Sequence, residues 1–237
     1  MKISLIIPAY NEEKYIGDCL RSVITNRTDD IIEIIVIDNA STDGTAAIAQ
    51  KFPGVRVVHE PEKGLTRARQ RGLLESKGDL VAYLDADTRM PYGWAAIAER
   101  EFSRDPNMVC LSGPFHYFDL PPIKKFFAEA MWTVTAPITY RLMGFMVLGA
   151  NFIAKRTALE KIGGFDTSIS FYGEDTNIAL RLSKVGKVRF SMKFFIIGSG
   201  RRLMEEGLVR TFWRYAINYL SIAMQQKPYT KEHKNIR

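Results

Sequence analysis

Cysteine is scarce in this chain of 237 residues, which contains only Cys19 and Cys110. Two cysteines at unrelated positions suggest neither a disulfide framework nor a thiolate metal site. We therefore expect no disulfide and a reducing, cytosolic setting.

Long apolar stretches are also missing. The longest run without a charged residue extends from Leu142 to Ala154, whereas a membrane-spanning helix needs about 20 apolar residues. The N-terminal sequence MKISLIIPAY has one lysine before a short apolar run that ends at Pro8, and a signal peptide would need a longer apolar region and a cleavage site. We therefore expect no bilayer-spanning helix and a strand at the N-terminus.

Two common phosphate-binding loops are absent as well. Neither G-x-G-x-x-G after the first strand nor G-x-x-x-x-G-K-[ST] occurs, which argues against a standard dinucleotide dehydrogenase and a P-loop NTPase. Zinc-finger spacing and RNA-binding signatures are missing too, so no nucleic-acid partner is expected. The net charge of +7 suits other anionic partners, such as phosphates or membrane lipids.

Apolar runs that alternate with helically spaced segments predict an α/β fold. The expected strands are Ile3–Pro8, Ile31–Asp38, Val55–His59, Leu80–Asp85 and Met108–Gly113. The expected helices between them are Glu12–Thr25, Thr42–Lys51, Leu65–Ser76 and Tyr92–Arg104. Repeated strand-helix-strand units predict a mostly parallel central sheet with helices on both faces, in a single Rossmann-like α/β/α domain.

The second half of the sequence is less regular. Helical patterns cover Ile123–Met143, Thr157–Ile162, Asp175–Lys184 and Met204–Met224, and strand-like runs cover Met146–Ala154 and Val188–Ile197. Prolines between Phe115 and Pro122 place a soft division there. We predict three parts: residues 1–115, residues 116–200 of the same domain, and a C-terminal helix with a polar tail in residues 201–237.

Polar side chains gather where the expected strands end. The residues after the first, second and fourth strands are Asn11 and Glu12, Asp38 to Thr45, and Asp85-Ala86-Asp87. Ligands of open α/β sheets bind beyond the carboxyl ends of the strands. Taken singly, Asn11 or Ser41 could cap a helix, and Asp43-Gly44 could form a turn.

Several carboxylates at one sheet edge repel one another unless a cation lies between them. A hard divalent ion held by one or two carboxylates, with positions left for phosphate oxygens and water, is typical of magnesium or manganese. The pattern therefore predicts a Mg²⁺ or Mn²⁺ site that receives a diphosphate.

Five segments, in order along the chain, resemble the family 2 glycosyltransferases of GT-A fold. They are IIPAYNEEKYI (Ile6–Ile16), VIDNASTDGT (Val36–Thr45), KGLTRARQRGLLESKGDLVAYLDADT (Lys63–Thr88), GANFIAKRTALEKIGGFD (Gly149–Asp166) and GEDTNIALRLSKVGK (Gly173–Lys187). The resemblance implies transfer of a sugar from a nucleotide diphosphate donor, usually with inversion and with Mn²⁺ or Mg²⁺ as cofactor. Residues 1–115 would then bind the nucleotide sugar, and residues 116–200 would bind the acceptor and carry the catalytic group.

The resemblance assigns the donor-binding residues. Those expected to border the base, ribose and diphosphate are Pro8, Tyr10, Glu12, Asp38, Lys63, Gly64 and Arg67. Asp85 and Asp87 match the metal and ribose site, with Asp87 as the direct metal ligand. Gly149-Ala150-Asn151 matches the segment that lines the donor sugar and the acceptor, although a glycine bend in a buried strand explains it equally. Arg67, Arg69 and Arg71 also fit a solvated helix face.

The pair Glu174-Asp175 matches the acidic pair that carries catalysis in this family. Asp175 is expected to be the general base, with Glu174 as the second choice or as an acceptor-binding group. Two acids at a helix start would also favour the helix dipole without any catalytic role. If the acceptor were an ionised phosphate, no base would be required, and Asp175 would orient it or stabilise the developing positive charge.

The sequence departs from the family where many relatives place a histidine after the last strand. The corresponding region reads IIGSGRRLMEEG, Ile196 to Gly207. Ser199, Arg201 or Arg202 could bind phosphate oxygens there instead, because guanidinium matches phosphate in a bidentate manner. A basic loop that faces water or lipid is the alternative.

Two segments suggest a membrane interface. Ile123–Met146 and Leu203–Met224 combine aromatic and aliphatic residues with Lys or Arg, a pattern typical of helices in the interface plane. Helices that close an ordinary core show it too. We expect peripheral attachment on the inner face of the membrane and a glycan or lipid-linked acceptor, in glycan or cell-envelope biosynthesis.

Two other functions would use the same fold. A nucleotidyltransferase that makes sugar nucleotides would need a basic, glycine-rich loop after the first strand, and Ala9-Tyr10-Asn11-Glu12-Glu13 is acidic. An inactive membrane scaffold would be expected to lose the acids that this chain retains. Both are therefore secondary hypotheses.

Overall fold

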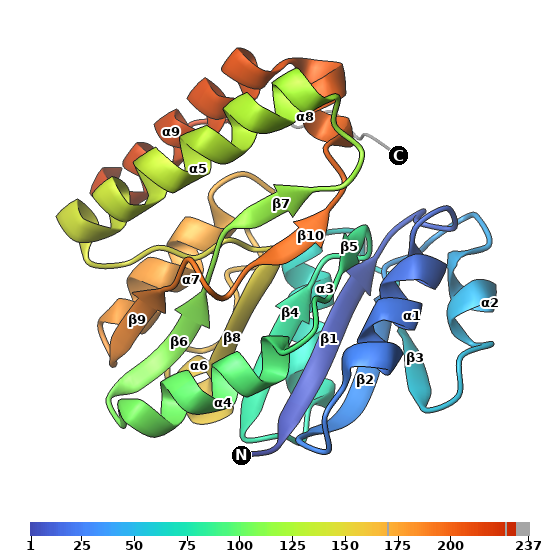
Figure 1. The fold of residues 1–237 in the computed structure, drawn as a ribbon. Helices are drawn as coiled ribbons and strands as arrows, with labels where there is room; N and C mark the ends of the chain where they lie inside the picture. The colour runs from blue at the N-terminus through green and yellow to red at the C-terminus, as the bar shows by residue number, and fades with distance from the viewer. Residues whose placement is uncertain (170, 226, 231–237) are drawn as a thin grey trace.

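The computed structural model describes residues 1–169, 171–225 and 227–230 (Figure 1). Up to residue 112, its elements are β1 (Ile3–Ala9), α1 (Ile16–Asn26), β2 (Ile31–Asp38), α2 (Thr45–Ala49), β3 (Val55–His59), α3 (Leu65–Glu75), β4 (Leu80–Leu84), β5 (Thr88–Arg89), α4 (Trp94–Arg104) and β6 (Met108–Ser112). They are followed by β7 (Phe115–Tyr117), α5 (Pro122–Met143), β8 (Asn151–Lys155), α6 (Arg156–Lys161), α7 (Glu174–Ser183), β9 (Lys187–Phe190), β10 (Ile196–Gly198), α8 (Arg201–Glu206) and α9 (Leu208–Gln225).

A seven-stranded sheet in the order β3-β2-β1-β4-β8-β6-β9 forms the centre of the fold. The pairs β1-β2, β2-β3 and β1-β4 are parallel, as predicted for the first half of the chain. The pair β6-β9 is also parallel, and β8 runs antiparallel to both β4 and β6. The strands β1 and β4 are buried along their whole length, since helices cover both faces of the sheet. The α/β fold class with a mostly parallel central sheet is therefore confirmed.

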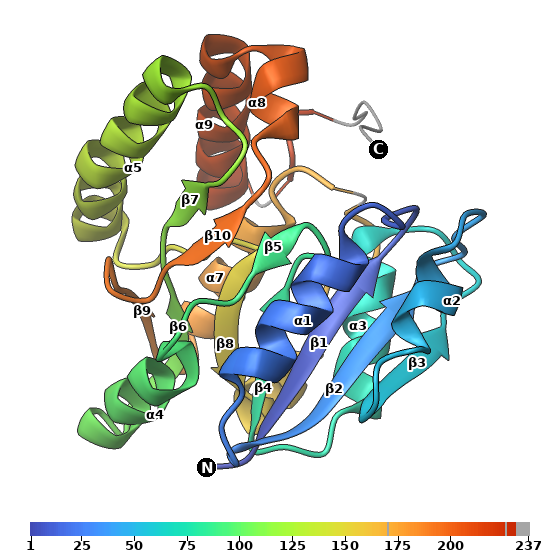
Figure 2. The same cartoon turned by 45° about the vertical axis from the view of Figure 1, so that its right-hand side comes forward.

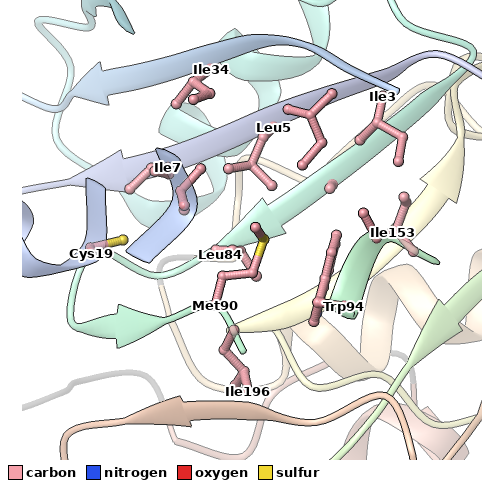
Figure 3. Packing of buried hydrophobic residues seen from close by; sticks show 14 of the residues in the cluster. Ile3, Leu5, Ile7, Cys19, Ile34, Leu84, Met90, Trp94, Ile153 and Ile196 are labelled. Carbon is pink, nitrogen blue, oxygen red and sulfur yellow. The ribbon is translucent and has the colours of Figure 1, made fainter. Parts of the chain in front are cut away.

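Two apolar cores lie on opposite faces of this sheet. The first packs α1, α2 and α4 against β1, β2 and β4 (Figure 3 shows part of it around Leu5, Leu84 and Trp94). The second packs α3, α6 and α7 against the other face. Successive strand residues point to opposite faces, so Leu5 and Ile7 belong to the first core and Ile6 to the second.

A second, three-stranded sheet in the order β5-β10-β7 lies beside the large one. In both views, α5, α8 and α9 lie above this small sheet (Figures 1 and 2). Strand β5 follows β4 and strand β7 follows β6 after short connections, and β10 pairs with both β5 and β7. The small sheet carries Arg201, the first residue of α8, to the edge of the large sheet.

Several predicted boundaries were wrong. The predicted strand Val188–Ile197 divides into β9 and β10, which belong to different sheets because a turn at residues 191–195 separates them. The predicted strand Met146–Ala154 begins only at Asn151. The predicted helix Met204–Met224 divides into α8 and α9 at Gly207, whose φ of 84° is a left-handed conformation that ends α8.

The first two predicted helices are shorter than expected. The helix α1 begins at Ile16 and α2 at Thr45, since the polar residues before them form hydrogen bonds with neighbouring loops.

No helix within the described residues is long and apolar enough to span a bilayer. Cys19 and Cys110 are both buried and unpaired. Most of the tail expected from Gln225 to Arg237 lies outside the described residues.

Asn151, the first residue of β8, links the large sheet to α4 and to the turn between β9 and β10. Its side chain is fully buried, accepts a hydrogen bond from Trp94 Nε1 at 2.9 Å, and donates one to the Phe194 carbonyl at 2.7 Å. Burial without hydrogen bonds would be costly for all three groups.

We predict that Asn151→Ala lowers the free energy of unfolding by about 2–4 kcal/mol, because it leaves the Trp94 indole N–H and the Phe194 carbonyl without this partner. Urea denaturation measures this loss. The exposed Asn107 provides the control, and Asn107→Ala should change the free energy by less than about 0.5 kcal/mol. Equal stability of Asn151→Ala and the wild-type protein would contradict the structural role.

Candidate active site

Three strand ends meet at one edge of the large sheet. Ala9 at the end of β1 pairs with Asp38 at the end of β2, and β4, on the other side of β1, is followed directly by Asp85. The antiparallel β8 begins at this same edge, since Asn151 pairs with Leu84. Gly149 and Ala150 are therefore brought beside Asp85.

The loops after β1 and β2 are joined by polar side chains. The Asn11 backbone N–H donates to Ser41 Oγ at 3.0 Å, and the Thr42 N–H donates to Asn11 Oδ1 at 2.8 Å. Neither α1 nor α2 has a side-chain cap. Asn11 and Ser41 thus fix the shape of the strand ends instead of capping helices.

A cavity of about 850 Å³ opens at this edge. Of the residues predicted from the sequence to form the site, it is lined by Pro8, Tyr10, Glu12, Lys63, Gly64, Asp85, Asp87, Glu174, Asp175, Arg201 and Arg202. These residues come from both halves of the chain. The cavity therefore joins Asp85 and Asp87, the aspartates predicted to bind metal, and the acidic pair Glu174-Asp175 in a single space.

Three predicted site residues do not line this cavity. Asp38 is buried and lies 3.1 Å from His59 Nδ1. Arg67 is half-buried and pairs with Glu62 at 2.6 Å. Asn151 is turned into the core, as described above, while its neighbours Gly149 and Ala150 line the cavity.

Asn39 shapes the side of the cavity next to Lys63 and Gly64. Its amide donates to the carbonyls of Glu60 and Glu62, and its Oδ1 accepts from the Gly64 N–H at 2.8 Å. Lys63 Nζ in turn donates to Tyr10 Oη at 2.7 Å. The loop after β3 is thereby fixed against the loop after β1.

Arg69 on α3 is the buried cation of the site. Its side chain is only 1% exposed, and it pairs with both Asp85, at 3.1 Å, and Glu174. It also donates to the Gly149 carbonyl at 2.9 Å. A Cβ on Gly149 would lie 2.5 Å from Glu174 Oε1, so glycine is required where this ion pair meets the backbone.

The alternative of a solvated helix face was wrong for Arg69, which is 1% exposed, whereas the side chains of Arg67 and Arg71 are half-buried, at 42% and 40% exposed. Sequence reasoning missed the role of Arg69. A signal was present, since Arg69 lies three residues after Thr66 and three before Gly72, on the buried stripe of α3.

Glu174 and Asp175 begin α7 and occupy different environments. Glu174 is buried against Arg69, and burial raises its pKa to about 7 although Arg69 opposes this shift. Asp175 is partly exposed and accepts from the Thr176 N–H at 2.7 Å. Burial also raises the pKa of Asp175, and backbone N–H groups oppose this shift. Gly173 before them has φ 81°, a conformation that other residues rarely adopt.

Asp87 and Glu12 share Arg201. The guanidinium binds both oxygens of Glu12, at 2.9 and 2.6 Å, and Asp87 Oδ2 at 2.9 Å. Arg202 points elsewhere, to Glu206 at 3.0 Å and over the Phe171 ring. Both arginine side chains are mostly buried, so they do not form a basic loop that faces water or lipid.

Asp85 and Asp87 are the residues that could hold a metal ion. They supply the carboxylate oxygens that Mg²⁺ and Mn²⁺ prefer, and they line the open cavity. Among the described residues, no cluster of three or more His, Cys, Asp and Glu could enclose a metal. The donor set therefore fits an ion whose remaining ligands are phosphate oxygens and water, and the guanidinium at Asp87 shows that this carboxylate accepts a cation.

Curated proteins similar to this chain are glycosyltransferases. The probable glycosyltransferase YdaM of Bacillus subtilis (strain 168) is 26% identical over 211 residues, which cover 82% of this chain and 49% of YdaM. The uncharacterized glycosyltransferase YibD of Escherichia coli (strain K12) is 40% identical over 90 residues, or 36% of this chain and 26% of YibD. The chain thus spans about half the length of YdaM, and its match to YibD covers about a quarter of that protein.

Solved structures show the same fold. The mannosyltransferase PcManGT of Pyrobaculum calidifontis, in complex with GDP-Man and Mn²⁺, aligns with a TM-score of 0.70 at 21% identity, over 95% of this chain and 63% of that one. The glucosyl-3-phosphoglycerate synthase of Mycobacterium tuberculosis, in complex with Mn²⁺, UDP and phosphoglyceric acid, aligns with a TM-score of 0.67 at 20% identity, over 94% and 78% of the two chains. The architecture is that of the GT-A fold.

A family model described as Glycosyl transferase family 2 matches residues 4–163, which include the strand-end motifs and Asp85-Ala86-Asp87. This match covers more than half of the sequence. The chain belongs to glycosyl transferase family 2.

Proposed function

We propose that this protein transfers a sugar from a nucleotide diphosphate donor to a lipid-linked acceptor, with inversion at the anomeric carbon and with Mn²⁺ or Mg²⁺ as cofactor. The observation that carries the proposal is a single cavity that is lined by Asp85 and Asp87, by Asp175, and by residues of α5 and α9, whose part of the cavity we call the chamber. A donor, a base and an acceptor chain would each have a place in it.

The donor would occupy the end formed by the first half of the chain. Tyr10 and Lys63 lie together beside the end of β1 and offer an aromatic face and a cation to the nucleotide. Asp38 and Arg67 do not reach this cavity, so we expect them to act through the loops that they support. In this proposal residues 1–115 bind the nucleotide sugar.

Asp85 and Asp87 would hold the metal ion. When bound, the ion would neutralise the charge that develops on the diphosphate as it leaves. The protein's own contribution is to place both carboxylates at the end of β4, with Arg69 fixing Asp85. The structures of PcManGT and of the glucosyl-3-phosphoglycerate synthase were solved with Mn²⁺, which supports this cofactor.

Asp175 is the proposed general base. An acceptor hydroxyl must lose its proton as the new bond forms, and a positioned carboxylate can take it. Asp175 is partly exposed to the cavity, whereas Glu174 is buried in its ion pair with Arg69. Glu174 therefore suits a positioning role. A base on the acceptor side fits direct displacement of the diphosphate, which inverts the anomeric carbon.

The acceptor would enter from the chamber between α5 and α9. The lining of this chamber is mostly apolar and aromatic, with three threonines. From α5 it consists of Met131, Trp132, Thr135, Thr139, Leu142 and Met143, and from α9 of Thr211, Phe212, Tyr215, Ala216, Tyr219 and Leu220. Such a lining matches a hydrocarbon chain better than a free sugar. Residues 116–200 would thus bind the acceptor and supply the base, and α9 in the last part, residues 201–237, would complete the chamber.

The outer surfaces of α5 and α9 support attachment to a membrane. Only Ala128 and Ala136 of α5 are buried. Large apolar side chains on the two helices are exposed and do not line the cavity, among them Phe126, Val134, Ile138, Val209, Trp213 and Met224. Closing a core does not account for side chains that face outward, and a patch of this kind marks an interaction surface. Lys124, Arg141 and Arg210 are exposed beside it and would attract anionic lipid, so we place the protein on the inner face of a membrane.

We predict that one of UDP-glucose, GDP-mannose and dTDP-glucose raises the melting temperature, and that Mn²⁺ increases the shift. Ligand at a hundred times its dissociation constant stabilises the folded state by about 2.7 kcal/mol. Asp87→Asn should lose only the increment due to Mn²⁺. Asp105→Asn, which alters an exposed pair with Lys187, should retain it. An Mn²⁺ increment that persists in Asp87→Asn would contradict the metal assignment.

We predict that Asp175→Asn slows release of the nucleotide diphosphate from that donor, with water as acceptor, by about 10²–10⁴-fold, because the general base is lost. Donor affinity should stay unchanged. In the wild-type protein the rate should fall as the pH falls through the pKa of Asp175, which burial places above the ordinary aspartate value. Asp166→Asn serves as the control. Full turnover of Asp175→Asn would remove the base assignment.

We predict that the protein floats with liposomes that contain anionic lipid at low salt and is released by high salt. The double variant Val134→Glu/Ile138→Glu should stay in the soluble fraction, because it places charge on the apolar surface of α5. Leu74→Glu is the control, since Leu74 is 72% exposed, against 59% for Val134 and 55% for Ile138, but lies on α3. Wild-type protein that remains wholly soluble would reject the membrane proposal.

A further inference from the structure

The ion pair of Arg201 with Glu12 and Asp87 links residues that lie far apart in sequence. Glu12 follows β1, Asp87 follows β4, and Arg201 begins α8. The guanidinium donates hydrogen bonds to Glu12 from both of its terminal nitrogens, and one of them, Nη2, also pairs with Asp87. Arg201 therefore contacts the carboxylate that the proposed function assigns to the metal.

This contact is shielded from solvent. The side chains of Arg201, Asp87 and Glu12 are 14%, 15% and 5% exposed, and the guanidinium also lies over the Tyr15 ring at 4.8 Å. Charges in such surroundings are screened much less than charges at the surface. A divalent ion at Asp87 and a guanidinium at 2.9 Å from the same carboxylate would repel each other strongly.

We propose that Arg201 is an internal counter-ion that occupies Asp87 in the free protein and leaves it when metal and diphosphate bind together. Glu12 would keep Arg201 inside the cavity during this change, since its bidentate contact does not involve Asp87. The guanidinium released from Asp87 would then meet the negative oxygens of the diphosphate. This inference rests on the proposed metal site and adds a coupling between metal and nucleotide.

The coupling has a measurable consequence for metal binding. When a site is free in only a fraction of the molecules, its apparent dissociation constant is the intrinsic constant divided by that fraction. Metal alone must displace Arg201 from Asp87 without offering it a new partner, whereas metal with a diphosphate offers one. By thermodynamic linkage, the nucleotide then raises metal affinity and the metal raises nucleotide affinity by the same factor.

The test is titration of Mn²⁺, followed by the electron paramagnetic resonance signal of the free ion, without nucleotide and with UDP or GDP. Without nucleotide, Arg201→Gln should bind Mn²⁺ about tenfold more tightly than the wild-type protein, if Arg201 holds Asp87 about nine-tenths of the time. With nucleotide, the coupling between Mn²⁺ and nucleotide should be smaller in Arg201→Gln than in the wild type. Arg201→Lys retains the positive charge but cannot form the bidentate contact. Its Mn²⁺ affinity without nucleotide should lie between those of the wild-type protein and Arg201→Gln.

Arg89→Gln controls for the simple loss of one positive charge near Asp87. Arg89 lies on β5 and pairs with Asp18 instead. An equal gain in Mn²⁺ affinity in Arg89→Gln and Arg201→Gln would overturn the inference, as would identical affinities of Arg201→Gln and the wild type. In either case, if Asp87→Asn lost Mn²⁺ binding, the assignment of Asp87 as a metal ligand would still stand. If no variant bound Mn²⁺ through Asp87 even with nucleotide, both the metal site and the inference would fail.

Discussion

The site depends on the balance between carboxylates and cations at one sheet edge. The parallel strands β1 and β4 and the start of α7 deliver Glu12, Asp85, Asp87 and Glu174 to the same cavity, where unpaired anions would be unstable. Two arginines supply the opposite charge. Arg69 joins Asp85 to Glu174, and Arg201 joins Asp87 to Glu12. Each arginine thereby connects segments that are distant in sequence, so the same contacts that neutralise the site also hold its parts together.

The two arginines differ in what they permit. Arg69 on α3 is almost completely buried, contacts Glu174 and the Gly149 carbonyl, and holds Asp85 in place through an ion pair. Arg201 begins α8, shortly after β10 of the small sheet, is 14% exposed, and lines the cavity together with the carboxylates that it contacts. A fixed counter-ion preserves the geometry of the site, whereas one at the open side can exchange partners. Under our proposal, this difference lets one strand end be stable without ligand and still bind a metal and a diphosphate.

Much of the fold and of the site could be predicted from sequence, because the strands of the first half are apolar and end in unusual residues. The five strands predicted there all exist, and Tyr10, Asp85, Asp87 and Asp175 meet in one cavity. The division of Val188–Ile197 into two sheets was not predictable, since local pattern does not report which strand becomes a partner. The helical spacing of α3 could have indicated that Arg69 is buried. The pairs Arg69–Glu174 and Arg201–Asp87 join residues more than 80 positions apart, which a single sequence does not reveal.

The central claim is that Asp87 holds a cation in every state of the site, first Arg201 and then a metal. A crystal structure with Mn²⁺ and a nucleotide diphosphate, with data collected at the manganese absorption edge, tests it most directly. The account predicts an anomalous peak beside Asp87 and the diphosphate, with Arg201 no longer in contact with Asp87. A peak at another place, or Arg201 unmoved on Asp87 while the diphosphate is bound, would contradict it.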